Sequence, residues 1–167
     1  MEGINIFETR NINVFNSPME IGLRILYILQ AVFPQQLDLN RLVIYDYFLL
    51  NSADFPNGPE SLHPAIPHRS SQIIVKPLII KDALAMMQSK ELIDVNFSAE
   101  GIKYQANPLT DKFIEFQESN YSRKLLTISN WIKLQFGQVD DNSLKTIIEN
   151  NIPNWGGEFL YESLIRE

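Results

Sequence analysis

The chain has 167 residues, 45% hydrophobic and 20% charged, which excludes a disordered protein and fits one globular domain with an appendage or two very small domains. It contains no cysteine, which excludes disulfides, thiolate zinc sites and cysteine nucleophiles; with no apolar run near the roughly 20 residues of a membrane span and no recognisable secretory leader, we expect a cytoplasmic protein. Its net charge of −6 opposes sequence-independent DNA binding, because that binding needs cationic side chains to displace counterions from phosphates.

A first helix is predicted to begin at Ser17 and Pro18, where a capping hydroxyl precedes a proline at a first helical position. Apolar residues then recur at helical spacing from Met19 to Phe33 and leave only a thin polar stripe. We therefore expect this helix to be covered on most sides and to end before Pro34.

A second helix is predicted from Leu39 to about Leu50, with Asp38 as its cap. Asp46 falls on the apolar stripe of this helix, where an unpaired carboxylate costs several kcal/mol. We favour a structural partner for it, such as Arg24 or Arg69. A contact with a partner protein is a second interpretation, and a catalytic carboxylate is the weakest.

Residues 51–70 form a long irregular segment in which Pro56, Pro59, Pro64 and Pro67 prevent a regular helix. Loops of this length in compact domains are usually functional or linkers. This one carries large apolar side chains, among them Phe55, so we expect it to pack on the domain.

His63 and His68 lie in this loop near Asp54 and Glu60, and these four residues are candidate ligands for a metal ion. Zinc sites need three or four convergent ligands, and the chain has no other histidine. We therefore expect structural histidines, no metal and no cofactor.

A third helix is predicted from Ser71 to about Ser89, with Pro77 either at a kink or in the first turn of a helix that starts at Lys76. Two alternating runs follow, Leu92 to Phe97 and Ile102 to Ala106, and predict a β-hairpin.

The last third of the chain is predicted to be helical. New helices are expected after Asn107 and from about Asn120, the second followed by Gly137 in a left-handed position. A short helix capped by Asp141 or Asn142 is expected to stop before Pro153.

Large apolar residues are concentrated in the last 40 or so positions, among them Trp155 and Phe159 on either side of a glycine hinge that leads into a last short helix. They belong either to the core of the domain or to an interface.

Three helices followed by a two-stranded wing is the element order of a winged helix-turn-helix domain. We expect a mainly α fold with a small β-hairpin, in which residues 1–107 form the winged-helix domain with its long proline-rich loop at 51–70. Residues 108–167 are then a C-terminal helical extension.

The surface that such a domain would present to DNA is close to charge balance. Lys76, Lys81 and Lys90 on the third helix are offset by acidic neighbours, and the wing offers Lys103. Guanine readout favours arginine, and the third helix has none. We therefore favour protein contacts and keep a DNA-binding transcriptional regulator or antitoxin, acting through Lys76, Lys81 and Lys103, as the alternative.

No enzyme motif appears in the sequence. Ser61, Leu62 and His63 are not surrounded by a GxSxG elbow, and there is neither a P-loop nor a GxGxxG motif. We expect no catalytic activity.

Three segments carry a family resemblance: FNSPMEIGLRILYIL, DLNRLVIYDYFLL and SADFPNGPESLHPAIPHRSSQIIVKPLIIKDALAMMQSKELI. They resemble the middle component of ABC-three-component systems, the small third subunits of Lamassu-type bacterial defence operons. The resemblance runs from about Phe15 to Tyr121, and GPESLHP at Gly58–Pro64 is its most distinctive part. Asn57 stands where a glycine is common, and the helices beyond Tyr121 are expected to be specific to this system.

The resemblance implies a non-catalytic accessory subunit that assembles with an SMC-like or Rad50-like ATPase and an effector, often a nuclease, and acts against phage or plasmids. DNA would be met only through the complex. We expect the loop, where Gly58 can supply a positive φ, to hold a partner-binding surface above Arg24 and Asp46; the alternative is that its polar groups only fold the loop onto its own domain. The candidate partner-binding residues are Arg24, Asp46, Phe55, Gly58, Pro59, Glu60, Ser61, Leu62, His63, Pro64, His68, Arg69, Trp155 and Phe159.

Overall fold

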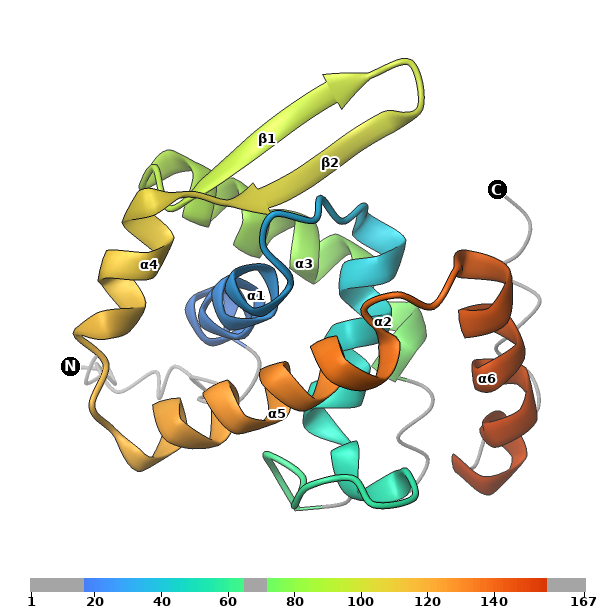
Figure 1. Cartoon of the computed structure of the whole chain (residues 1–167). Coiled ribbons are helices and arrows are strands. Elements are labelled where there is room, and N and C mark those ends of the chain that lie inside the picture. Colours follow the sequence, from blue (N-terminus) through green and yellow to red (C-terminus); the bar gives the residue numbers. More distant parts are fainter. Residues whose placement is uncertain (1–16, 65–71, 156–167) are drawn as a thin grey trace, which may run out of the picture.

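The computed structural model describes residues 17–64 and 72–155. Over these residues the chain is mainly helical, as expected, with six α-helices, one short 3-10 helix and one two-stranded antiparallel hairpin (Figure 1). The elements are α1 (Pro18–Val32), α2 (Leu39–Leu50), η1 (Ser52–Asp54), α3 (Gln72–Ser89), β1 (Ile93–Ser98), β2 (Gly101–Ala106), α4 (Pro108–Glu115), α5 (Asn120–Phe136) and α6 (Asp141–Trp155). None of the helices described is long and apolar enough to cross a bilayer.

Local capping chemistry sets the predicted helix starts. The Ser17 hydroxyl accepts a hydrogen bond from the Glu20 amide at 3.2 Å, and the Asp38 carboxylate accepts one from the Arg41 amide at 2.8 Å. Asn107 caps α4 in a capping box, with Pro108 at the first helical position. These three predictions are confirmed.

Helix α1 lies at the centre of the fold and contacts α2, α3, α4, α5 and β2 (Figure 1). Its polar stripe is largely covered along with its apolar face: Arg24 is fully buried and Tyr27 is 3% exposed, and α2, α4 and α5 each supply a hydrogen-bonding partner to this stripe. The same core continues into α5 and α6 through Leu125, Leu144 and further apolar residues. The division of the chain at residue 107 stays a prediction.

The hairpin has a buried base and an exposed tip. Ile93 pairs with Ala106 at the base, where both are buried, and Phe97 near the tip is 76% exposed. Backbone hydrogen bonds between Leu37 and Tyr104, at 2.8 and 3.0 Å, fasten β2 to the segment between α1 and α2. The hairpin therefore projects beyond the helices (Figure 1).

The C-terminal third differs from the sequence prediction in two places. Gly137 has φ −59°, so it continues the right-handed turn of α5, and the left-handed position expected there is wrong. Helix α6 is capped by Asp140, whose carboxylate accepts a hydrogen bond from the Ser143 amide at 2.9 Å, and it continues through Pro153 to Trp155.

Pro77 lies inside α3, which begins at Gln72, so a helix start at Lys76 is wrong. A proline removes one backbone hydrogen bond from a helix. The buried side chains of Ile80 and Leu84 hold the following turns against the core, which offsets that loss.

Candidate protein-interaction site

The proline-rich loop folds back on itself through two serines. The Ser52 hydroxyl donates to the Glu60 carbonyl at 3.3 Å, and the Ser61 hydroxyl accepts from the Ala53 amide at 3.1 Å. The helix η1 begins this return and is the only regular structure between α2 and Pro64. The two ends of the turn are thus held together by the loop's own side chains.

Asn57 and Gly58 at the tip have different roles from those expected. The positive φ, 58°, belongs to Asn57, and asparagine is one of the few residues that adopt this conformation readily. Gly58 is required for a different reason: a Cβ there would lie 1.9 Å from the Ser52 carbonyl oxygen.

Two apolar side chains anchor the loop to the domain. Phe55 and Leu62 are 8% and 7% exposed and belong to the main core. The Phe55 ring lies 4.7 Å from that of Phe48 on α2, 5.5 Å from that of Phe136 and 5.6 Å from that of Trp131 on α5. The expected packing of the loop on the domain is confirmed for residues 51–64, the part of the loop that the structure describes.

Glu20 lies at the centre of a polar network that joins the loop to three helices. Its Oε1 is 3.0 Å from His63 Nε2, accepts a hydrogen bond from the Tyr121 hydroxyl at 2.9 Å, and lies 3.2 Å from Arg24 Nη1. Burial, together with the hydrogen bond to Glu20, raises the pKa of Tyr121 above its ordinary value. The loop, α1 and α5 therefore meet at one carboxylate.

Arg24 extends this network to α2. Its Nε donates to Asp46 Oδ1 at 2.6 Å and its Nη2 to Oδ2 at 3.1 Å, and neither side chain is exposed. Burial alone would lower the pKa of Arg24, but the charge and hydrogen bonds of Asp46, with the charge of Glu20, raise it above its ordinary value. The structural pairing of Asp46 with Arg24 is confirmed, and Arg69 lies outside the described residues.

The candidate residues divide by exposure into a buried base and an outer rim. Arg24, Asp46, Phe55 and Leu62 are buried, so they support the surface and offer no contact area of their own. The rim consists of the exposed Glu60 and Pro64 with the half-buried Gly58, Pro59, Ser61 and His63. His68, Arg69, Phe159 and the side chain of Trp155 lie outside the part of the chain that the structure describes.

A hollow of about 240 Å³ separates the loop from α5. Pro59 and Glu60 line one side of it, and Arg123, Lys124 and Thr127 line the other. Lys124 Nζ lies 3.3 Å from Glu60 Oε2 across this hollow. The contribution of α5 to this hollow was not predicted from the sequence. The sequence did contain an indication of it, because α5 carries three cationic residues and no carboxylate.

Arg41 has a structural role that was not predicted from the sequence. Its guanidinium donates to the carbonyls of Phe136 and Val139 and lies 2.6 Å from Asp141 Oδ1, while its Nε and Nη2 contact the Tyr45 hydroxyl. One side chain of α2 therefore holds the end of α5 and the start of α6, and no local pattern indicated it.

The lysines proposed for DNA binding lie on α3 and on the hairpin. Lys81 is exposed on α3, Lys103 lies 3.1 Å from Glu100 on the hairpin, and the side chain of Lys76 is not described. Within residues 17–64 and 72–155 there is also no group of three or more His, Cys, Asp or Glu side chains that could hold a metal ion.

Comparison with known families identifies a family for this chain. The family model described as ABC-three component (ABC-3C) system Middle Component 2 matches residues 14–158. The match includes α5 and all of α6, so the expectation that the resemblance fades beyond Tyr121 is wrong. No match was found among curated proteins or among solved structures.

Proposed function

Since this chain belongs to the ABC-three component (ABC-3C) system Middle Component 2 family, we propose that it is the non-catalytic scaffold of its system. In this proposal it bridges an SMC-like (Rad50-like) ATPase and a nuclease-type effector and helps to regulate the effector in defence against phage or plasmids. The family match over residues 14–158 is the observation that carries the proposal, because a middle component acts among partner subunits.

The rim of the loop is the first contact surface that we propose. Its exposed and half-buried residues stand on anchored groups: Phe55 and Leu62 in the core, and His63 on Glu20. A surface that is already ordered loses less conformational entropy when a partner binds. This favours Glu60, Pro59 and their neighbours as contact residues, with the buried Arg24 and Asp46 as their support.

We also propose that α1, α2, α3 and the hairpin form a winged-helix variant that binds protein, through the loop between α2 and α3, and not DNA. The order of these elements along the chain supports this. So does the near balance of charge on α3 and the hairpin, because a phosphate backbone is gripped by an excess of cations.

The test is co-purification of the tagged chain with the other two components of its system, followed by mass measurement of the complex. We expect an assembly that contains all three, and a Glu60→Ala, Arg69→Ala double variant that is recovered in it at least tenfold less. The matched control is Lys81→Ala, Asp82→Ala, which removes one cation and one exposed carboxylate on α3.

Two outcomes contradict this proposal. If the wild-type chain forms no complex with its system's other components, the scaffold function is wrong. If the loop variant is folded and assembles as well as the control, the loop surface is wrong. Tight, salt-sensitive and sequence-dependent DNA binding by the purified chain would favour a transcriptional regulator instead.

A further inference from the structure

We propose that the outward face of α5, formed by Arg123, Leu126, Asn130, Lys133 and Leu134, is the docking surface for an acidic amphipathic helix of a partner subunit. This inference rests on the proposed scaffold function and deepens it, because it names a second surface and the chemistry of what that surface binds. Below, these five residues are called the α5 outer face.

The α5 outer face is a single stripe. At 100° per residue, its five positions fall within about 100° of arc. The opposite side of the helix carries Leu125, Ile128 and Ile132, all at most 1% exposed. Helix α5 therefore presents large apolar side chains on two sides, and only one of these sides is covered by the described part of the domain.

Two leucines on this stripe are largely exposed to solvent and do not contribute to the core of the described domain. Leu126 is 48% and Leu134 80% exposed, and the exposed Asn130 lies between them. Residues at intervals of four form one of the ridges by which helices pack against each other. A single asparagine within such a seam fixes the register of two paired helices, because its amide requires a polar partner. The spacing and the central amide thus fit a helical occupant.

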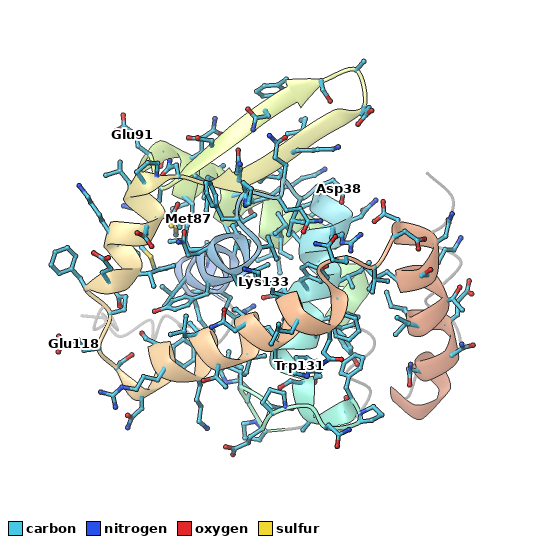
Figure 2. The ribbon with its side chains drawn as sticks, viewed as in Figure 1. Asp38, Met87, Glu91, Glu118, Trp131 and Lys133 are labelled. Atoms are coloured by element: carbon cyan, nitrogen blue, oxygen red, sulfur yellow. The ribbon has the colours of Figure 1, made fainter. Side chains whose placement is uncertain are left out.

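The charge of α5 indicates the chemistry of that occupant. The helix carries Arg123, Lys124 and Lys133 and no carboxylate, in a chain whose net charge is −6. Figure 2 shows Lys133 and Trp131 on opposite sides of α5, with Trp131 toward the loop. Lys124 already faces Glu60, so Arg123 and Lys133 remain as the cations near the two ends of the stripe. Carboxylates beside the apolar residues of the incoming helix complement this arrangement.

Two other occupants fit the α5 outer face less well. A second copy docking through the same face in a twofold contact would bring the cations of one copy close to those of the other, which is repulsive. A nucleic acid would need a row of cations along the phosphates, and here uncharged residues separate Arg123 from Lys133.

The direct test is photo-crosslinking within the complex of all three components. Leu134 is replaced by photoreactive p-benzoylphenylalanine, and Leu78, a leucine of α3 that is 73% exposed, carries the same group in the matched control. We expect position 134 to crosslink to a helical segment of a partner in which Asp and Glu outnumber Lys and Arg, and position 78 not to crosslink to that segment. A crosslink from position 134 to a second copy, to nucleic acid or to a basic segment overturns the proposal, and so does no crosslink at all.

A charge reversal gives the second measurement. We expect Arg123→Glu with Lys133→Glu to weaken assembly at least tenfold, whereas Lys81→Glu with Lys112→Glu, which changes the charge equally on α3 and α4, leaves it within twofold. If the wild type assembles and the α5 reversal, shown to be folded, assembles equally well, the docking surface is wrong while the scaffold function stands. If the wild type forms no complex, both proposals are wrong.

Discussion

Arg24 on α1 and Asp46 on α2 form a two-point ion pair, with contacts of 2.6 and 3.1 Å, in which neither side chain is exposed to solvent. Two buried charges are stable only when each satisfies the other, because both have lost their hydration. The pair also connects α2 to Glu20, and through Glu20 to His63 of the loop. The base of the candidate site therefore depends on one helix–helix contact.

Removing one member of this pair is expected to be severely destabilising. Arg24→Met should lower the free energy of unfolding by about 3–5 kcal/mol, because it leaves the Asp46 carboxylate buried without its partner. The measurement is urea denaturation followed by circular dichroism.

The control for this effect is the double variant Arg24→Met, Asp46→Leu, which removes both charges and keeps apolar volume. We expect it to recover at least half of the stability that the single variant loses, since no fully buried charge then remains without a partner. Glu20, which also meets Arg24, is partly exposed and keeps its contacts with Tyr121 and His63. Equal losses in the single and double variants would show that packing of the arginine, rather than charge pairing, holds α1 to α2.

The tip of the loop provides a matched pair of substitutions. Gly58→Ala places a Cβ against the Ser52 carbonyl and should cost about 1–3 kcal/mol, the usual range for an overpacked site. Asn57→Gly should change stability by less than about 1 kcal/mol, because glycine adopts a φ of 58° without strain. Thermal unfolding of both variants checks this. If Gly58→Ala is as stable as Asn57→Gly, the close backbone approach at Gly58 is wrong.

The sequence predicts the parts of this fold that depend on neighbouring residues. Ser17 with Pro18, and Asn107 with Pro108, mark helix starts because a cap and a proline act within one turn. The pairing of Asp46 with Arg24 could be proposed as well, since a carboxylate on an apolar stripe needs a cation and few are available.

The same reasoning does not reach contacts that the tertiary fold creates. Glu20 has a sufficient local explanation in the first turn of α1, yet its carboxylate also meets Tyr121, a residue 101 positions away. The usual effect of proline on helices predicts that α6 ends before Pro153. The structure continues the helix to Trp155, and its N-terminal half is held by the Asp140 cap and by burial of Leu144 and Ile148. The proposed interaction surface on α5 could not be predicted for a related reason. From the sequence alone Leu126 and Leu134 could belong to the core, and only the burial of Leu125, Ile128 and Ile132 shows which side of the helix faces inward.

Alkaline pH should weaken the contact between α5 and the loop network. Burial and the hydrogen bond to Glu20 raise the pKa of Tyr121 in the folded protein above the ordinary value of about 10. The folded state therefore holds this proton more tightly than the unfolded state does. The resulting stability is complete below about pH 10 and is lost as the pH rises through the folded-state pKa.

Tyr121→Phe is the variant that isolates this effect. We expect its free energy of unfolding to fall less steeply above pH 10 than that of the wild type, in urea titrations at matched ionic strength. The free energy of unfolding of the variant should still decrease somewhat with pH, because burial also raises the pKa of Tyr45 and of Tyr104. Parallel curves for the variant and the wild type would contradict the role of Tyr121.

The last prediction concerns Arg41, which holds the junction of α5 and α6. Its donors reach the Phe136 and Val139 carbonyls at the end of α5, where backbone oxygens lack a helical partner. The Phe136 carbonyl also accepts from the Tyr45 hydroxyl and the Val139 amide, so the Val139 carbonyl is the one that relies on Arg41. Arg41→Lys keeps the charge but loses the planar fork, so it should still cost about 1–3 kcal/mol for the carbonyl left unsatisfied. In the Arg41→Lys variant, amide hydrogen exchange should speed up more in α6 than in α3 relative to the wild type, because α6 is held at this junction.

Arg123→Lys is the matched control, since it makes the same chemical change at an exposed position of α5 and should alter stability by less than about 0.5 kcal/mol. The contrast separates the loss of a fork that contacts two carbonyls from the loss of an arginine in general. Equal stability of the two variants would mean that Asp141, which a lysine can also reach, supplies the whole contact. Faster exchange in α6 alone, with the rest of the core unchanged, would place the role of Arg41 at the junction between the two C-terminal helices.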